Sequence, residues 1–167
     1  MKSPPDDDLW KAYHEAGHAV AAHALGGELQ WVSILPTQHY QGICQFSMNR
    51  TFVTYSDRPA INKHICQIVI SLAGPAAQTR FAPGSCEPEQ AGKDRCDALE
   101  SMVRLAAIRG AYPHDLAYYE ELADRFVYED ENWAAIQSLA EALCRCQRLS
   151  GLKSAGIIDR VWEDLYG

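Results

Sequence analysis

Residues 6–27 read DDDLWKAYHEAGHAVAAHALGG, and this stretch decides how the N-terminal part of the chain folds. Three aspartates open it, where carboxylates can cap the first amides of a helix and face its positive dipole end. Gly26 and Gly27 close it with a typical helix stop. Between these signals, apolar and small residues recur at steps of three and four: Trp10, Tyr13, Gly17, Val20, Ala21 and Ala24. The stretch therefore predicts one amphipathic helix with a face in the core.

This helix carries His14-Glu15-Ala16-Gly17-His18, an H-E-x-x-H motif. Residues four apart on a helix lie about 6 Å from each other on one face, so both imidazoles can reach a single ion. Glu15 projects about 100° further round the helix, beside the ion, where it can take a proton from an activated water. We expect a zinc (Zn²⁺) site with His14 and His18 as ligands and Glu15 as general base.

The rest of the chain is predicted to be mostly helical with a small sheet. Short β-branched runs at 31–35 and 42–46 predict two strands, and residues 51–55 can add a third. The further predicted helices cover about 59–81, 92–108, 114–128, 132–149 and 154–166. The expected fold class is α+β and mainly helical, a zincin-like helical domain with a two- or three-stranded sheet. No repeat or long linker divides residues 1–167, which we expect to form a single domain.

The composition is that of a globular domain and restricts its partners. Apolar residues make up 47% and charged residues 22%, as in average globular domains. A net charge of −7 repels phosphate backbones and anionic membrane surfaces, so nucleic acid and membranes are not expected partners. The first eight residues do not resemble a signal peptide, and no stretch is apolar for long enough to span a bilayer. A chain of this length does not need its six cysteines as disulfides, so we expect reduced thiols and a cytoplasmic protein.

A catalytic zinc site needs a third protein ligand, and the neighbouring histidine does not supply it. His23 lies about 140° from His18 round the helix and faces elsewhere. The metzincin pattern is absent, because Ala21 and Ala24 stand where it needs Gly and His. The third ligand must therefore come from another element.

Three segments resemble the peptidase domain of the FtsH family of ATP-dependent zinc proteases, in the same order and with the same spacing. They are residues 14–20 (HEAGHAV), 31–36 (WVSILP) and 71–77 (SLAGPAA). Residues 133–151 also resemble its closing helices. The resemblance implies a zinc metalloendopeptidase, a hydrolase that cleaves peptide bonds with metal-activated water.

The resemblance also implies a third zinc ligand. In that family it is an aspartate at the start of a later helix, with a glycine just before it and an alanine four residues after it. Residues 92–98 (GKDRCDA) are similar and assign the role to Asp94. Asp97, three residues on, is the competing candidate, and Glu87 and Glu89 are further alternatives.

A peptide or an unfolded protein is the substrate that the resemblance implies. An extended segment of it would lie beside one edge of the sheet and make main-chain hydrogen bonds. The residues of that edge are Ile43, Cys44, Gln45 and Phe46. The alternative is an edge strand that only closes the sheet. In the loop before it, His39 and Tyr40 are candidates for donating a hydrogen bond to the oxyanion.

The sequence also departs from the family. Residues 1–167 contain no G-x-x-x-x-G-K-[ST] motif, so we expect no nucleotide binding and no ATPase motor. We also expect no membrane anchor, since no stretch is apolar for long enough. The family usually has Arg where Pro75 stands and Glu where Gln78 stands, which weakens the expectation that these positions support the site.

Three interpretations follow. The first is an ATP-independent endopeptidase, either a monomer or a small homo-oligomer. The second is a zinc-binding regulatory or adaptor protein, an inactive homologue that works with a separate ATPase or another regulator. The third is a repressor-cleaving peptidase of the kind that controls mobile elements, with a different third ligand.

Overall fold

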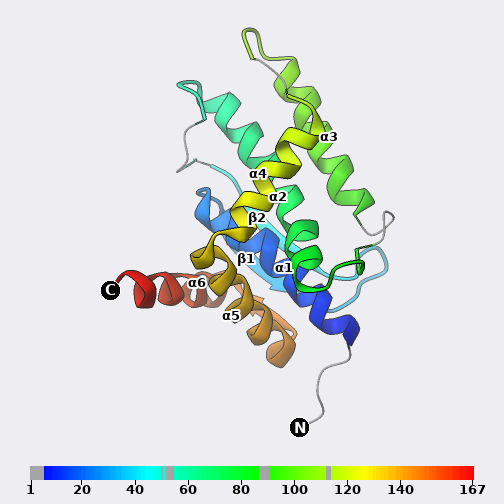
Figure 1. Cartoon of the computed structure of the whole chain (residues 1–167), viewed down its shortest axis with the longest axis vertical. Coiled ribbons are helices and arrows are strands. Elements are labelled where there is room, and N and C mark those ends of the chain that lie inside the picture. Colours follow the sequence, from blue (N-terminus) through cyan, green and yellow to red (C-terminus); the bar gives the residue numbers. More distant parts are fainter. Residues whose placement is uncertain (1–5, 50, 52–54, 87–90, 112–113) are drawn as a thin grey trace.

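The structure is a computed structural model that describes residues 6–49, 51, 55–86, 91–111 and 114–167. Its elements, in chain order, are α1 (Asp6–Ala24), β1 (Glu28–Ser33), β2 (Ile43–Ser47), α2 (Pro59–Phe81), α3 (Gly92–Ala106), α4 (Leu116–Tyr128), α5 (Asp130–Cys146), β3 (Arg148–Ser150) and α6 (Gly151–Tyr166). The fold is α+β and mainly helical with a small antiparallel sheet, as the sequence predicts (Figure 1).

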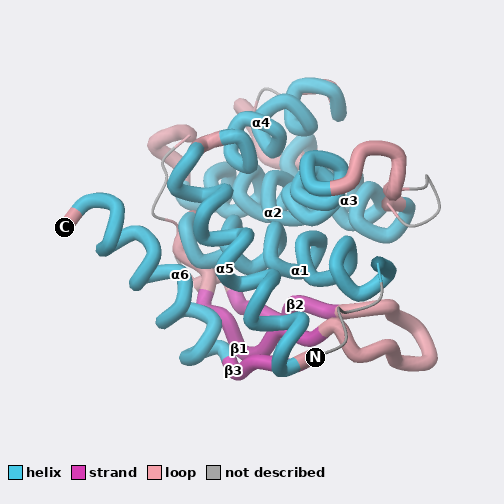
Figure 2. Tube along the Cα trace, turned by 60° about the horizontal axis from the view of Figure 1, so that its bottom comes forward, coloured by secondary structure: helices cyan, strands magenta, loops and turns pink. Residues whose placement is uncertain are grey.

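Helix α1 lies at the centre of the fold. It packs against α2 and α5 and also against the strands β1 and β2. Figure 2 shows the sheet on one side of α1 and the helices α2, α3 and α4 on the other. The helix ends where predicted, because Gly26 adopts a φ of 102° that favours glycine and the Gly27 amide donates to the Ala22 carbonyl at 2.7 Å.

Small residues let α1 and α2 approach each other closely. A Cβ atom added at Gly17 would lie 2.6 Å from the Ala73 carbonyl oxygen and 2.7 Å from the Ala77 Cβ atom. The neighbour of Gly17, Ala16, is fully buried as well. Helix α2 was predicted over about 59–81, and this is the span observed. The two helices therefore fix each other's position along the length that carries the motif.

The sheet has the order β2-β1-β3, with both pairs antiparallel. The strand β2 is thus an edge strand, as predicted for residues 43–46. The third strand of the described sheet is β3, while the further strand predicted at 51–55 falls largely on residues 52–54, which lie outside the described part. In β3, Ser150 pairs with Trp31 and Leu149 with Val32.

The predicted helix over 132–149 was wrong at its C-terminal end, where residues 148–150 form β3. The helix α5 stops at Cys146 because Gln147 takes a left-handed φ of 61°, and its amide donates to the Leu143 carbonyl at 2.7 Å. The Gln147 carbonyl then accepts from the Ile34 amide at 2.9 Å, which starts the pairing with the sheet. Leu149 is consequently buried in the core.

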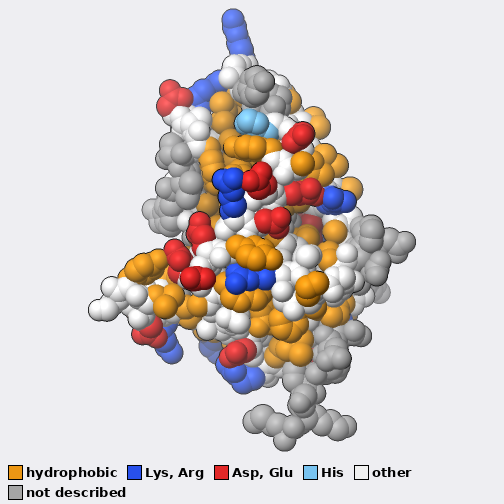
Figure 3. Space-filling model, viewed as in Figure 1, with side chains coloured by type: hydrophobic (Ala, Val, Ile, Leu, Met, Phe, Trp, Pro, Cys, Tyr) orange, Lys and Arg blue, Asp and Glu red, His pale blue; other side chains and the backbone are white. Residues whose placement is uncertain are grey.

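Lysine and arginine side chains are scattered among acidic and apolar ones on the face shown in Figure 3. Among the described residues, no helix combines the length and the apolar character that crossing a membrane requires.

Candidate metal centre

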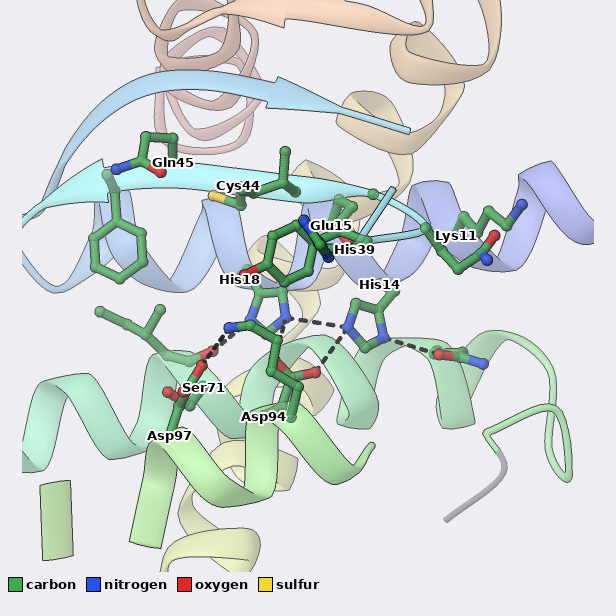
Figure 4. Close-up of a pocket in the computed structure, with 18 of the residues that line it drawn as sticks. Lys11, His14, Glu15, His18, His39, Cys44, Gln45, Ser71, Asp94 and Asp97 are labelled. Atoms are coloured by element: carbon green, nitrogen blue, oxygen red, sulfur yellow. Dashed lines mark hydrogen bonds and ion pairs between the residues drawn. The ribbon is translucent and has the colours of Figure 1, made fainter. Parts of the chain in front are cut away.

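His14 and His18 lie one turn apart on α1 and point to the same side of the helix, as the motif predicts (Figure 4). Their ring centroids are 4.8 Å apart, and their Nε2 atoms are 3.1 Å apart. The helix holds them at the protein interior, since Ala12, Ala16 and Ala19 are fully buried around them. His18 itself is only 8% exposed. Both ring nitrogens are therefore presented to one small volume.

Asp94 reaches this volume from the first turn of α3. Its Oδ2 atom lies 2.9 Å from His14 Nε2, and its Oδ1 atom lies 3.3 Å from His18 Nε2. The ligand atoms of His14, His18 and Asp94 all fall within 4.8 Å of one another, close enough to hold one ion. Two imidazole nitrogens and a carboxylate oxygen are ligands that suit zinc and leave a fourth position for water.

The competing candidates for the third ligand do not join this group. Asp97 lies on the same helix, but its carboxylate pairs with Lys93 at 2.8 Å and its side chain is 45% exposed. Glu87 and Glu89 lie outside the described residues. His23 faces away from the site, as expected, and pairs with Asp159 at 2.7 Å. The geometry therefore favours Asp94.

The far nitrogen of each imidazole is held by a hydrogen bond. His18 Nδ1 donates to the Ile70 carbonyl oxygen at 2.8 Å, and His14 Nδ1 donates to Gln78 Oε1 at 2.8 Å. Because the Nδ1 protons are used in this way, the lone pairs of the neutral rings lie on Nε2 and point toward Asp94. Such second contacts are what orient metal-binding histidines in proteins. The departure from the family put a supporting role of Gln78 in doubt, but its side chain does contact His14.

The charges of the three groups depend on one another. Burial by itself lowers the pKa of His18, but the Asp94 carboxylate outweighs it and raises that pKa to about 9. Burial by itself raises the pKa of Asp94, but His18 and His14 outweigh it and hold that pKa well below its ordinary value. The cluster thus favours a positive charge between the carboxylate and the rings, which a divalent cation supplies.

Glu15 lies beside this cluster and is only 7% exposed. Burial is the largest influence on its carboxyl group and raises its pKa, while His18 and His14 oppose the shift. Gly42 provides the space for it, since an added Cβ atom there would lie 2.8 Å from Glu15 Oε1. A buried carboxyl group with a raised pKa is suited to proton transfer.

One cavity of about 630 Å³ contains both the cluster and the predicted substrate residues. Ile43, Cys44, Gln45 and Phe46 line it from β2, and Figure 4 shows Cys44 and Gln45 on the side of the histidines opposite Asp94. His39 and Tyr40, the proposed oxyanion donors, line the same cavity. Burial raises the pKa of the Cys44 thiol well above its ordinary value, so this thiol is neutral.

Sequence reasoning missed several residues of the cavity, including Lys11, Ile70, Ser71 and Lys93. Lys93 precedes Asp94 and lies 5.3 Å from the centre of the Tyr40 ring, so it links α3 to the loop before β2. Its place next to Asp94 was a usable signal. Ser71 belongs to the resembling segment 71–77 but was not singled out for the site, and Ile70 gave no signal. Only the approach of α2 to α1 brings these two residues to the site.

The glycine in the resembling segment 71–77 has a steric role. A Cβ atom added at Gly74 would lie 2.3 Å from His18 Nε2 and 2.5 Å from its Cε1 atom. The imidazole therefore rests directly on the backbone of α2.

Comparison of the chain with models of known protein families finds no match, and comparison with curated proteins finds none either.

Proposed function

We propose that this protein is a zinc-dependent endopeptidase with a peptidase domain of the FtsH type. The observation that carries the proposal is the meeting of His14, His18 and Asp94 in one cavity with the buried carboxyl group of Glu15. The resemblance of residues 14–20, 31–36 and 71–77 to that family supports the same activity. Asp94 is proposed as the third ligand, and the reaction needs no nucleotide.

The residues of the cavity have separate tasks in the proposed hydrolysis. A bound zinc ion supplies a Lewis acid that makes water reactive near neutral pH. Glu15 takes a proton from the attacking water and delivers it to the amide nitrogen as the C–N bond breaks. The water oxygen remains on the new carboxyl group, and the amine leaves with the proton that Glu15 delivered.

The edge strand β2 is the proposed binding site for the substrate backbone. Its residues Ile43 and Phe46 are half-buried and line the cavity that holds the metal ligands. An extended peptide that adds to this edge makes main-chain hydrogen bonds and requires little sequence preference. The proposed substrates are therefore peptides and unfolded segments of proteins.

The proposed compartment is the cytoplasm. The thiols of Cys44, Cys66 and Cys144 are free, which suits a compartment where thiols remain reduced.

The test of the proposal compares the purified protein with its Glu15→Gln variant, using casein and a peptide library with added zinc. Wild type should cleave, a chelator should stop cleavage, and zinc should restore it. The variant should bind zinc as wild type does and lose roughly 100-fold or more of the rate. Zinc binding by wild type without any cleavage that depends on Glu15 would exclude the peptidase and favour the regulatory or adaptor protein.

A further inference from the structure

Gln78 on α2 is completely buried and makes hydrogen bonds in two directions. Its Oε1 atom lies 2.8 Å from His14 Nδ1 on α1. Its Nε2 atom donates to the backbone carbonyl oxygen of Ser85 at 3.1 Å and to the Ser85 hydroxyl at 3.3 Å. One amide thus joins the helix that bears the motif to the segment that follows α2.

The Ser85 carbonyl decides how this amide is oriented. A carbonyl oxygen accepts hydrogen bonds and donates none, so the NH₂ group of Gln78 must face Ser85. The amide oxygen then faces His14 and can only accept, which makes His14 Nδ1 the donor. A neutral imidazole with its proton on Nδ1 carries its lone pair on Nε2, the atom that lies 2.9 Å from the Asp94 carboxylate.

We propose that Gln78 is a positioning residue that selects the nitrogen with which His14 binds the metal, and that the Ser85 carbonyl imposes this choice through the Gln78 amide. The inference rests on the proposed zinc site and concerns how this chain holds it. For His18 the same task belongs to the Ile70 carbonyl, a backbone group. Gln78 is therefore the side chain through which substitution can disturb the tautomer of a metal-binding histidine.

The burial of Gln78 makes this contact hard to replace. Its side chain is 0% exposed, so an apolar side chain of similar volume leaves no room for a water molecule in its place. The Nδ1 proton of His14 would then lack an acceptor in a buried position, which is costly. The ring can avoid this cost by turning or by moving its proton to Nε2, and both changes withdraw the lone pair from the metal.

The test measures zinc affinity of the full chain by competition with a chromophoric chelator. Gln78→Leu removes the acceptor at similar volume and should weaken zinc binding by about 10–100-fold, as loss of a supporting contact does. Gln78→Glu keeps an oxygen facing His14 and should bind zinc much more tightly than Gln78→Leu. Equal weakening in both variants would overturn the proposal, because a merely structural role does not distinguish them.

Asn62→Leu is a matched control on the same helix. Asn62 is also a buried amide, and its Oδ1 atom accepts from the Tyr55 and Ser56 amides at 2.8 and 2.7 Å, away from the metal ligands. This variant should lower the thermal midpoint and leave zinc affinity unchanged. Should it weaken zinc binding as much as Gln78→Leu, general destabilisation accounts for both effects and the role of Gln78 is refuted.

A measurement on wild type does not depend on the folding of any variant. Nitrogen-15 NMR of the zinc-loaded protein should show a slowly exchanging proton on His14 Nδ1 and the metal on Nε2. Zinc on Nδ1 overturns the inference while the zinc site itself stands. A wild-type protein that binds no zinc removes the proposed function, and this inference with it.

Discussion

The Nε2 atoms of His14 and His18 lie 3.1 Å apart, while the Nδ1 atom of each ring is held by an acceptor on the far side. Two ring nitrogens and the Asp94 carboxylate thus point electron pairs at one another in a buried place. Such groups repel unless a proton or a cation lies among them. The arrangement favours binding of a cation. The stability and the zinc affinity of the protein should therefore depend on whether a proton or a metal cation lies among these groups.

Asp94→Asn should remove most of the zinc affinity, because it replaces the anionic ligand that contacts both histidines. The loss should exceed the roughly 10–100-fold that follows from removing a supporting contact. Asp97→Asn is the matched control, since Asp97 is on the same helix but pairs with Lys93 near the surface. Metal content after dialysis and competition with a chelator measure zinc binding by the two variants. Retention of zinc by Asp94→Asn, with its loss in Asp97→Asn, would assign the ligand to Asp97.

Gly74→Ala should weaken zinc binding although it adds only one methyl group. That methyl group would lie 2.3 Å from His18 Nε2, and the ring cannot simply withdraw, because its Nδ1 proton is held by Ile70. We expect a loss of zinc affinity of about tenfold or more. Gly92→Ala, where no atom lies within 4 Å of the added carbon, should bind zinc like wild type. Equal affinity of the two variants would contradict the contact between His18 and α2.

Gly151→Ala should destabilise the fold at the junction of β3 and α6. Its added Cβ atom would overlap the Leu29 carbonyl oxygen of β1 at 1.7 Å, which forces a backbone shift that costs about 1–3 kcal/mol or more. Gly156→Ala in the same helix meets no atom within 4 Å and should stabilise by about 0.5–1 kcal/mol. Denaturant unfolding of both variants measures the difference, and the same sign for both would refute the close packing at Gly151.

Local signals were sufficient to predict most of the helices. Pro59 at the start of α2 and Gly26 at the end of α1 are strong signals, and the apolar periodicity between such signals defines a buried face. The strand β3 gave no such signal. It has three residues, and its partners Trp31 and Val32 lie more than a hundred positions away in the sequence. A left-handed Gln147 is also an uncommon way to end a helix.

The sequence predicted the part of the candidate site that lies on a single helix. His14, Glu15 and His18 follow from the spacing within α1, but the choice between Asp94 and Asp97 depends on how α3 is rotated against its neighbours. That rotation is set by packing, since Ala98 and Leu105 of α3 are buried in a cluster with residues of α2. The contact of Gln78 with His14 spans 64 positions and leaves no trace in the local sequence.

The metal-free protein should lose stability as the pH rises. The pKa of His18 in the fold is about 9, above the ordinary value of 6.5. A raised pKa means that the protonated ring stabilises the fold fully below pH 6.5 and that this contribution is lost as the pH rises through about 9. In the presence of a chelator, the thermal midpoint should therefore fall across this window.

Zinc affinity should show the opposite dependence on pH, because zinc replaces the proton on His18. Its affinity should rise over the same window, and binding below about pH 9 should release a proton that an indicator dye can record. Asp94→Asn supplies the control, since it removes the carboxylate that raises this pKa most. In the presence of a chelator, the thermal midpoint of Asp94→Asn should depend much less on pH between 6.5 and 9 than that of wild type. An unchanged dependence would show that another group titrates there and that Asp94 does not control the charge of His18.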